Sequence, residues 1–251
     1  MLQLVYMRKS ISTAILFYLL LLVSCNPSYR SASVEYRNYN VQQKGNQNSQ
    51  INALIKPYSD SVNGTMNNVI GENDVLLEKS VRKNTLGFFM TDAFLFMAKQ
   101  KFNTEVDVAF MNHGGIRLNE LSAGKITNGT IFELMPFDNL LILQKVKGKI
   151  LKLYLDTMAF GGTVIQSGLS MTISNKKPEN ILVGNKPLDE NADYVISNSD
   201  YMINNSEILK TIPVQNIGYL QRDAIIDYVL MITQKGKKIV VENTNRVVYA
   251  D

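Results

Sequence analysis

The stretch VDVAFMNHGGIR, residues 106–117, carries the most information about the fold. Residues 106–111 form a short apolar run rich in strand-forming residues, and the Asn-His-Gly-Gly that follows is typical of a tight turn. The glycine pair lets the backbone approach a ligand closely, and Arg117 offers a planar guanidinium for an oxyanion or a base edge. Taken alone, the stretch fits a structural turn with a surface arginine better than a site.

Helix and strand patterns surround this stretch without strict alternation. Thr85 is a candidate N-cap for a largely buried helix whose apolar stripe reaches Met97. Further expected elements are a strand at 140–146, a helix from Lys147, a hairpin-like pair of strands at 181–183 and 194–197, a helix capped by Asp223, and strands at 239–242 and 247–249. This mixture predicts an α+β fold, with a mixed sheet and packed helices.

A second motif lies at residues 133–140, ELMPFDNL. Pro136 fixes its own φ and favours an extended Met135, so Phe137 sits on a stiffened loop just before a strand. A ring in that place can stack on a nucleobase, and Asn139 carries both a donor and an acceptor for a base edge. An ordinary core phenylalanine is the alternative, and it fits the motif better in isolation.

The composition limits the classes of function. The chain has 251 residues with 45% hydrophobic and 19% charged residues, which is an ordinary globular balance. A net charge of +4 without an arginine-rich helix or a long basic run makes nucleic acid an unexpected partner. The sequence contains a single Cys and a single His, so it can form no intrachain disulfide. Carboxylates alone could hold Mg²⁺ or Mn²⁺, but no clustered acids in the sequence point to such a site.

The N-terminal residues read as an export signal. A short basic start at Arg8 and Lys9 precedes an apolar run at 14–23 that is short for a membrane span. Leu-Val-Ser-Cys, residues 22–25, resembles a bacterial lipobox, which implies a lipoprotein signal peptide at 1–24 and lipidation of Cys25. The chain would then be exported and lipid-anchored to the bacterial membrane, facing the periplasm or the cell surface. A plain signal anchor or a buried free Cys is the alternative.

A polar tether is expected at residues 25–50, because this segment lacks apolar periodicity. The folded domain is expected at 51–251. Its first apolar residues, from Ile51 to Tyr58, are spaced like a helix face, and Pro57 is expected to end or kink that helix.

The motifs together resemble the C-terminal domain of the bacterial 5'-nucleotidase and UDP-sugar hydrolase family. The resemblance runs from about Asn84 to Met202 and weakens toward the end of the chain. It is carried by motifs in the family's order, namely residues 85–87, 112–117, 123–127 and 133–139, Gly148, and residues 198–201. The order and spacing of these motifs are more specific than any one of them.

In that family the domain binds the nucleoside, and two aromatic rings clamp the base. The resemblance implies that Phe137 and Tyr201 are these rings and that Arg117 and Asn139 are polar partners. It also implies substrate-binding roles for Asn112, Gly114, Gly115 and Glu207. The chain departs from the family at residues 204–207, Asn-Asn-Ser-Glu, where a glycine pair followed by Asp is usual, and this puts base preference and affinity in doubt.

The family's catalytic half is a separate metallophosphoesterase domain with two metal ions held by several His, Asp and Asn. One histidine cannot supply such a site, and His113 fits a loop histidine better than a metal ligand. We therefore expect no catalytic residue, metal or cofactor in this chain. The hypothesis is the recognition half of a split 5'-nucleotidase whose divalent metals lie in a separately encoded metallophosphatase chain. A stand-alone nucleoside-binding or structural lipoprotein is the rival, and an autonomous hydrolase is the least favoured.

Overall fold

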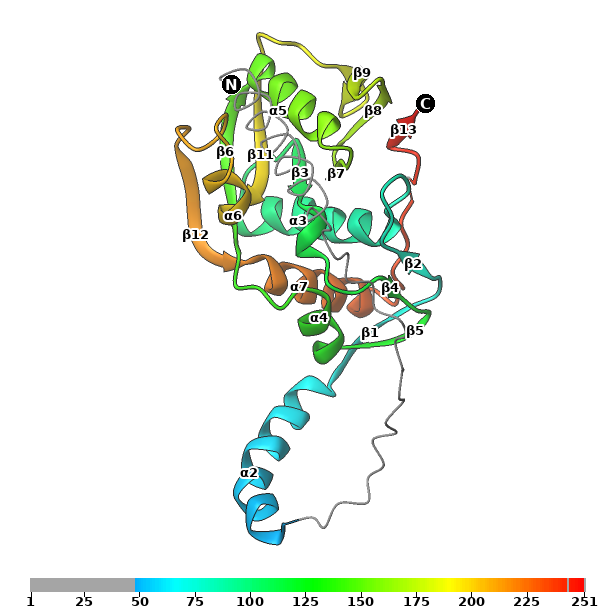
Figure 1. Cartoon of the computed structure of the whole chain (residues 1–251), viewed down its shortest axis with the longest axis vertical. Coiled ribbons are helices and arrows are strands. Elements are labelled where there is room, and N and C mark those ends of the chain that lie inside the picture. The colour runs from blue at the N-terminus through cyan, green and yellow to red at the C-terminus, as the bar shows by residue number, and fades with distance from the viewer. Residues whose placement is uncertain (1–47, 243, 251) are drawn as a thin grey trace, which may run out of the picture. The chain divides into compact units, whose positions relative to one another are not determined.

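Five strands form the central sheet, in the order β12 (Val214–Leu220), β6 (Leu140–Lys147), β11 (Asp193–Ser199), β3 (Val108–Met111) and β7 (Ile165–Ser167). β11 and β3 are parallel, and the other neighbours are antiparallel, so the sheet is mixed. The computed structural model describes residues 48–242 and 244–250 (Figure 1). The predicted α+β fold with a mixed sheet and packed helices is confirmed.

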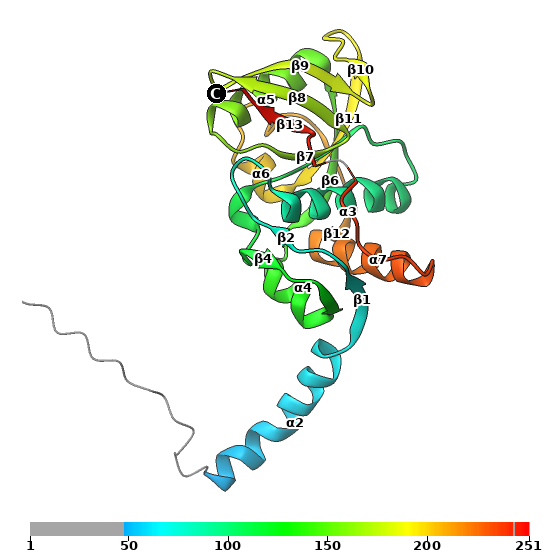
Figure 2. The ribbon, with the colours of Figure 1, turned by 90° about the vertical axis from the view of Figure 1, so that its right-hand side faces the viewer.

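One face of this sheet is covered by α3 (Thr85–Phe102), which lies between the sheet and α7 (Gln221–Gln234) in both views (Figures 1 and 2). A helix packed on two sides needs apolar residues around most of its circumference, and α3 buries eleven side chains or glycines. Its N-cap is Asn84, whose Oδ1 accepts from the N–H of Gly87 at 2.7 Å. The expectation of Thr85 as the cap is wrong, because the Thr85 hydroxyl instead accepts from the N–H of Glu78.

The opposite face carries α5 (Gly148–Phe160), which contacts β6, β11 and a strand of a second sheet. The second sheet has four strands, in the order β10 (Lys186–Pro187), β9 (Lys177–Val183), β8 (Leu169–Ser174) and β13 (Val247–Tyr249). The remaining elements are β1 (Val69–Asn73) paired with β5 (Gly124–Thr127), β2 (Leu77–Glu78) paired with β4 (Glu120–Leu121), the 3-10 turn η1 (His113–Gly115), α4 (Asn128–Leu134) and α6 (Asp200–Asn204).

Two strand predictions are wrong. Residues 181–183 and 194–197 do not pair, because β9 belongs to the second sheet and β11 to the central one. The Gly184–Asn185 turn leads instead from β9 into the two-residue β10. Residues 239–242 form no strand, and Ile239 makes only an isolated bridge to Asn73. The helix predicted to be capped by Asp223 begins at Gln221, with Leu220 as its N-cap.

Three chain segments meet at one edge of the central sheet. β3 and β11 both end there because they are parallel, with Ser197 opposite Ala109. β6 begins there because it is antiparallel to β11, with Leu141 opposite Ser199. The residues after β3, before β6 and after β11 are therefore brought together, although 60 residues separate Leu140 from Asp200.

The first described helix, α2 (Ser49–Met66), contains no buried residue. It continues past Pro57 to Met66, so the expectation that this proline could end the helix is wrong. Water can solvate the carbonyl that Pro57 leaves without a donor, because the helix is exposed on all sides. The apolar residues at Ile51, Leu54 and Tyr58 are 52%, 70% and 72% exposed. Residues 49–50, assigned by the sequence to the tether, belong to this helix.

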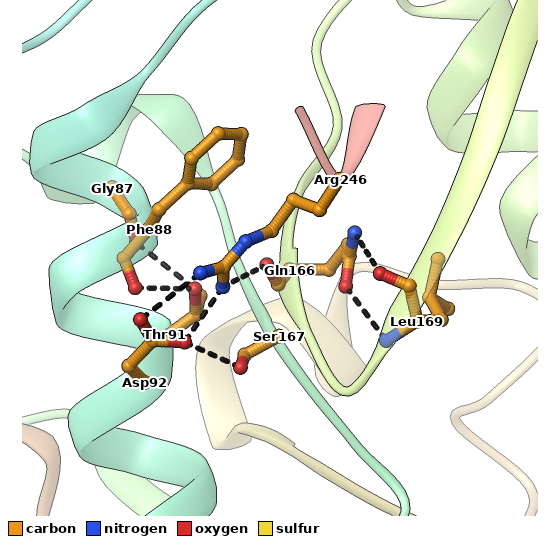
Figure 3. A network of polar contacts seen from close by, with 8 residues as sticks. All are labelled: Gly87, Phe88, Thr91, Asp92, Gln166, Ser167, Leu169 and Arg246. Carbon is orange, nitrogen blue, oxygen red and sulfur yellow. Dashed lines mark hydrogen bonds and ion pairs between the residues drawn. The ribbon is translucent and has the colours of Figure 1, made fainter. Parts of the chain in front are cut away.

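A buried ion pair fastens the C-terminal segment to α3 (Figure 3). The Arg246 guanidinium donates to both carboxylate oxygens of Asp92, at 2.6 and 3.0 Å, and lies 4.7 Å from the centroid of the Phe88 ring. Asp92 also accepts from the hydroxyl of Ser167, and Arg246 donates to the carbonyl of Gln166. The Arg246 side chain is 6% exposed, so the pair joins β7, α3 and the segment before β13 in a water-poor environment.

Replacing Asp92 with Asn should lower the free energy of unfolding by about 3 kcal/mol, because the buried guanidinium would lose its counter-charge. Asp156→Asn is the control, since Asp156 pairs with Lys152 on an exposed helix face and should cost less than about 0.5 kcal/mol. Urea unfolding measures both variants. Equal losses would show that the Arg246 pair contributes no more than a surface pair.

Candidate functional site

The residues that follow β3 form the first wall of a cavity. Met111 ends the fully buried β3, and the chain turns through η1. A Cβ at Gly115 would lie 2.9 Å from Asn112 Oδ1 and 3.0 Å from Met111 Cε, so a side chain there would displace the cavity-lining amide of Asn112. Gly114 is less constrained, with its nearest neighbour at 3.5 Å. The tight turn predicted from the Gly-Gly pair is therefore present, and the second glycine is the more closely packed of the two.

The loop between α4 and β6 forms the second wall. The N–H of Arg117 donates to the carbonyl of Leu134 at 2.9 Å, which joins the end of α4 to the residues after η1. The Arg117 guanidinium lies 5.8 Å from the centroid of the Phe137 ring. Phe137 is 38% exposed, so it is not sealed in the core as the alternative interpretation required. The two motifs singled out in the sequence are thus in contact.

The third wall is the start of α6, which carries Tyr201. Ser199 caps this helix, and its hydroxyl accepts from the N–H of Met202. The Asp200 carboxylate accepts from the N–H of Leu140 at 3.0 Å and from the N–H of Tyr201 at 2.8 Å. One carboxylate therefore connects the segment that follows Phe137 to the helix that carries Tyr201.

The three walls enclose a cavity of about 320 Å³. Its lining consists of Asn112, Gly114, Gly115, Arg117, Phe137, Asn139 and Tyr201. Seven of the eight substrate-binding residues predicted from the sequence lie together here. Both aromatic rings reach the surface, since Tyr201 is 53% exposed. The cavity combines two aromatic faces with one cation and two amide side chains.

Glu207, the eighth predicted residue, does not line this cavity. Its side chain is 87% exposed and forms an ion pair with Lys210. The residues between Tyr201 and Glu207 close the end of α6, because the Asn205 side-chain amide donates to the Tyr201 carbonyl at 2.7 Å. Asn205 is therefore the C-cap of this short helix, and Asn204 is its last residue.

Sequence reasoning missed residues that support the site from outside the lining. Asp200 belongs to the 198–201 motif, but the sequence assigned it no role. Arg222 lies far away in the sequence and donates to the carbonyl of Phe137 and to Asp138. A carboxylate next to an aromatic residue at a helix start gives a weak local signal for Asp200. Nothing in the sequence near Arg222 points to a contact across 85 residues.

His113 lies in η1, next to the cavity-lining turn. Its Nδ1 is 3.5 Å from the side-chain nitrogen of Asn84, and the nearby Lys79 donates to the carbonyl of Ile116. Burial, followed by the positive charge of Lys79, lowers the pKa of His113 from its ordinary value. This environment favours a neutral imidazole near neutral pH.

The described residues, 48–242 and 244–250, contain no group of three or more His, Cys, Asp or Glu side chains placed to hold a metal ion. Within the same residues, no helix has both the length and the apolar character needed to cross a bilayer.

Comparison with known proteins adds an independent observation. The family model for the 5'-nucleotidase C-terminal domain matches residues 62–212. A 5'-nucleotidase of Vibrio vulnificus is 29% identical over 147 residues, which are 56% of this chain and 26% of the relative. Protein UshA of Escherichia coli is 25% identical over 154 residues, covering 59% of this chain and 28% of the relative. This chain therefore spans about a quarter of the curated relatives it matches.

The solved structures with a similar fold include 5'-nucleotidases. The crystal structure of a 5'-nucleotidase precursor from Thermus thermophilus superposes with a TM-score of 0.66 at 23% identity. The superposition covers 78% of this chain and 42% of that one. A putative 5'-nucleotidase from Staphylococcus aureus gives a TM-score of 0.63 at 14% identity, over 83% and 45% of the two chains. At these identities the likeness establishes the fold alone.

The lowered pKa of His113 gives a prediction for pH dependence. The unfolded chain protonates His113 near its ordinary pKa of 6.5, whereas the folded chain resists protonation until a lower pH. Its contribution to stability is therefore present above pH 6.5 and lost as the pH falls through the folded pKa. His113 is the only histidine in the sequence, so His113→Gln should lose less thermal stability than the wild type between about pH 7.5 and pH 5.5. An equal fall in melting temperature for the variant and the wild type over this pH range would contradict the prediction.

Proposed function

The chain belongs to the 5'-nucleotidase C-terminal domain family, and on that basis we propose that its cavity binds the nucleoside part of a nucleotide. The family resemblance found in the order of the sequence motifs is confirmed by the match over residues 62–212. The observation that carries the proposal is the convergence of Phe137, Tyr201 and Arg117 on one cavity from three separate segments. Such convergence is not needed to build a hydrophobic core, because both rings are partly exposed.

The chemistry of the lining suits a base held between rings. An aromatic face stacks on a purine or a pyrimidine without regard to its hydrogen-bond pattern, and such stacking contributes about 1 to 3 kcal/mol per base. The amides of Asn112 and Asn139 can donate to and accept from a base edge or a ribose. Arg117 supplies a charge for an oxygen-rich group, and its position beside the Phe137 ring keeps the guanidinium next to the stacking face.

We further propose that the chain is the recognition half of a split 5'-nucleotidase. Hydrolysis with paired metal ions needs several imidazole and carboxylate ligands, and this sequence has one histidine. A separately encoded metallophosphatase chain would supply the metals and the attacking water. This chain would hold and orient the nucleoside, which lowers the entropic cost of presenting the phosphate to that partner.

The place of action in this proposal is the cell envelope. The export signal and the lipidation of Cys25 are supported by the basic start, the short apolar run and the Leu-Val-Ser-Cys sequence. These residues lie outside the described part of the chain. A lipid anchor would restrict the domain to the membrane surface, where nucleotides outside the cytoplasm would meet it.

Truncating one ring tests the binding proposal. Phe137→Ala should weaken the binding of adenosine and of uridine by about 10- to 100-fold, since the ring contributes stacking energy to either base. Phe160→Ala is the matched control, because Phe160 is 71% exposed on α5 and does not line the cavity. Isothermal titration calorimetry on the full chain measures the dissociation constants. Unchanged affinity in Phe137→Ala would refute a base-stacking role.

Activity measurements test the division of labour. A metallophosphatase partner alone should hydrolyse p-nitrophenyl phosphate, and adding this chain should lower the KM for AMP about tenfold while leaving p-nitrophenyl phosphate unaffected. Phe137→Ala should abolish the effect on AMP. Release of phosphate from AMP by this chain alone, persisting after chelator treatment, would overturn the split. Nucleoside binding without any effect on the phosphatase would favour the rival, a stand-alone binding or structural lipoprotein.

A further inference from the structure

The first turn of α7 holds the loop that carries Phe137. The Arg222 guanidinium donates from Nη1 to the carbonyl of Phe137 at 3.3 Å and from Nη2 to the Asp138 carboxylate at 2.6 Å. The backbone N–H of Gln221 donates to the carbonyl of Asn139 at 2.9 Å. Gln221 and Arg222 therefore hold three consecutive residues of the loop, 137–139. Two of these three, Phe137 and Asn139, line the cavity.

Arg222 is placed unusually for a charged side chain. It is 8% exposed, and its Cζ lies 4.2 Å from the centroid of the Phe132 ring on α4. An apolar side chain of similar length would pack against that ring without the cost of desolvating a charge. The guanidinium donates two hydrogen bonds, and both go to the loop, so its contribution beyond packing is to hold the loop in position.

The support continues from the loop to the second ring. Leu140, the residue after Asn139, donates its backbone N–H to Asp200, and the same carboxylate oxygen accepts from the N–H of Tyr201. Hydrogen bonds thus connect α7 to the Phe137 loop and, through the Asp200 side chain, the loop to α6. A shift of the loop would change the distance between the two rings.

We propose that Arg222 is a positioning residue that sets the Phe137 ring opposite Tyr201. This inference rests on the proposed function, because the ring spacing matters only if a base enters between the rings. Arg222 touches no ligand in this proposal. It acts through two hydrogen bonds, one to the backbone carbonyl of Phe137 and one to the side-chain carboxylate of Asp138. Together these bonds fix the position of the two neighbouring residues.

The test is Arg222→Met in the full chain. Methionine keeps the apolar contact with Phe132 and removes both donors. The dissociation constants of adenosine and uridine should rise about tenfold, whereas the urea midpoint of unfolding should change little because a buried charge is removed together with its interactions. A residue with only a structural role would show the opposite pattern, with lower stability and unchanged affinity.

Arg246→Met is the matched control. Arg246 also lies over a phenylalanine ring, binds a carboxylate oxygen at 2.6 Å and donates to a backbone carbonyl at 3.3 Å, but it does not line this cavity. This variant should lose stability, because it leaves the Asp92 carboxylate, only 23% exposed, without its counter-charge, whereas Asp138 is 78% exposed. It should keep its dissociation constants within about twofold of the wild type. A tenfold loss of affinity in both variants would show that loosening the fold anywhere weakens binding, and would overturn the inference.

A double-mutant cycle with Phe137→Ala identifies the path of the effect. If Arg222 acts through Phe137, Arg222→Met should change the dissociation constant less than about twofold once the ring is absent. Equal effects in the two backgrounds would overturn the inference. Should Arg222→Met fail to fold, Asp138→Asn removes the same ion pair from the exposed side, where the carboxylate is 78% exposed, and should weaken binding severalfold.

The proposed function and this inference fail differently. A wild-type chain that binds neither adenosine nor uridine would overturn both. A wild-type chain that binds, with Arg222→Met binding equally well, would overturn only the inference. Hydrogen exchange of residues 135–141 gives a measurement without ligand, and Arg222→Met should exchange faster there than the wild type, while Arg246→Met should not. Unchanged exchange in Arg222→Met would contradict the proposed support of the loop.

Discussion

The directions of three neighbouring strands determine where the candidate site can form. β6, β11 and β3 are adjacent, and the alternation of one antiparallel and one parallel pairing puts the start of β6 beside the ends of the other two. The backbone hydrogen bonds of these ladders fix the register, and a shift by one residue would turn every buried side chain of a strand to the other face. The strand pairings that build the core thus bring the three cavity walls to one end of the sheet, and hydrogen bonds from Asp200 and α7 hold the loop that carries Phe137 there.

The sequence predicted what is decided locally. The apolar run before Asn112 formed a strand, the glycines formed a turn, and Pro136 placed Phe137 on a loop, because each depends on neighbouring residues alone. The pairing of 181–183 with 194–197 was wrong because turn residues indicate where a strand ends, but the competition among all strands decides which neighbour it takes. Arg222 was missed for the same reason, since its partners are defined only by the tertiary fold. The order of the motifs made up for part of this loss. The family resemblance grouped residues from distant segments, such as Phe137 and Tyr201, which hydrophobic periodicity cannot do.

Two buried arginines, Arg222 and Arg246, make the same set of interactions in two parts of the fold. Arg246 joins α3 to the segment before β13, and Arg222 joins α7 to the Phe137 loop. Each guanidinium lies over a phenylalanine ring, which accepts its apolar faces, while its edge donates in the plane to a carboxylate and a carbonyl. The planar fork suits such tasks, because a lysine ammonium could not hold two acceptors at fixed angles. Their environments differ at the acid, which is 23% exposed in Asp92 and 78% exposed in Asp138.

The exposed helix α2 has a consequence for how the domain opens. Its last turn is held by Asn128, whose side-chain amide donates to the carbonyl of Thr65, whereas the residues from Ser49 onward contribute nothing to the core. An unsupported helix of this length is only marginally stable in water, and Pro57 and Gly64 weaken it further. We therefore expect α2 to fray from its first residues in a subglobal transition that leaves the five-stranded and four-stranded sheets intact. Its backbone amides should therefore have a far smaller opening free energy than those of α3, which buries eleven residues, and the molecule should melt in two stages.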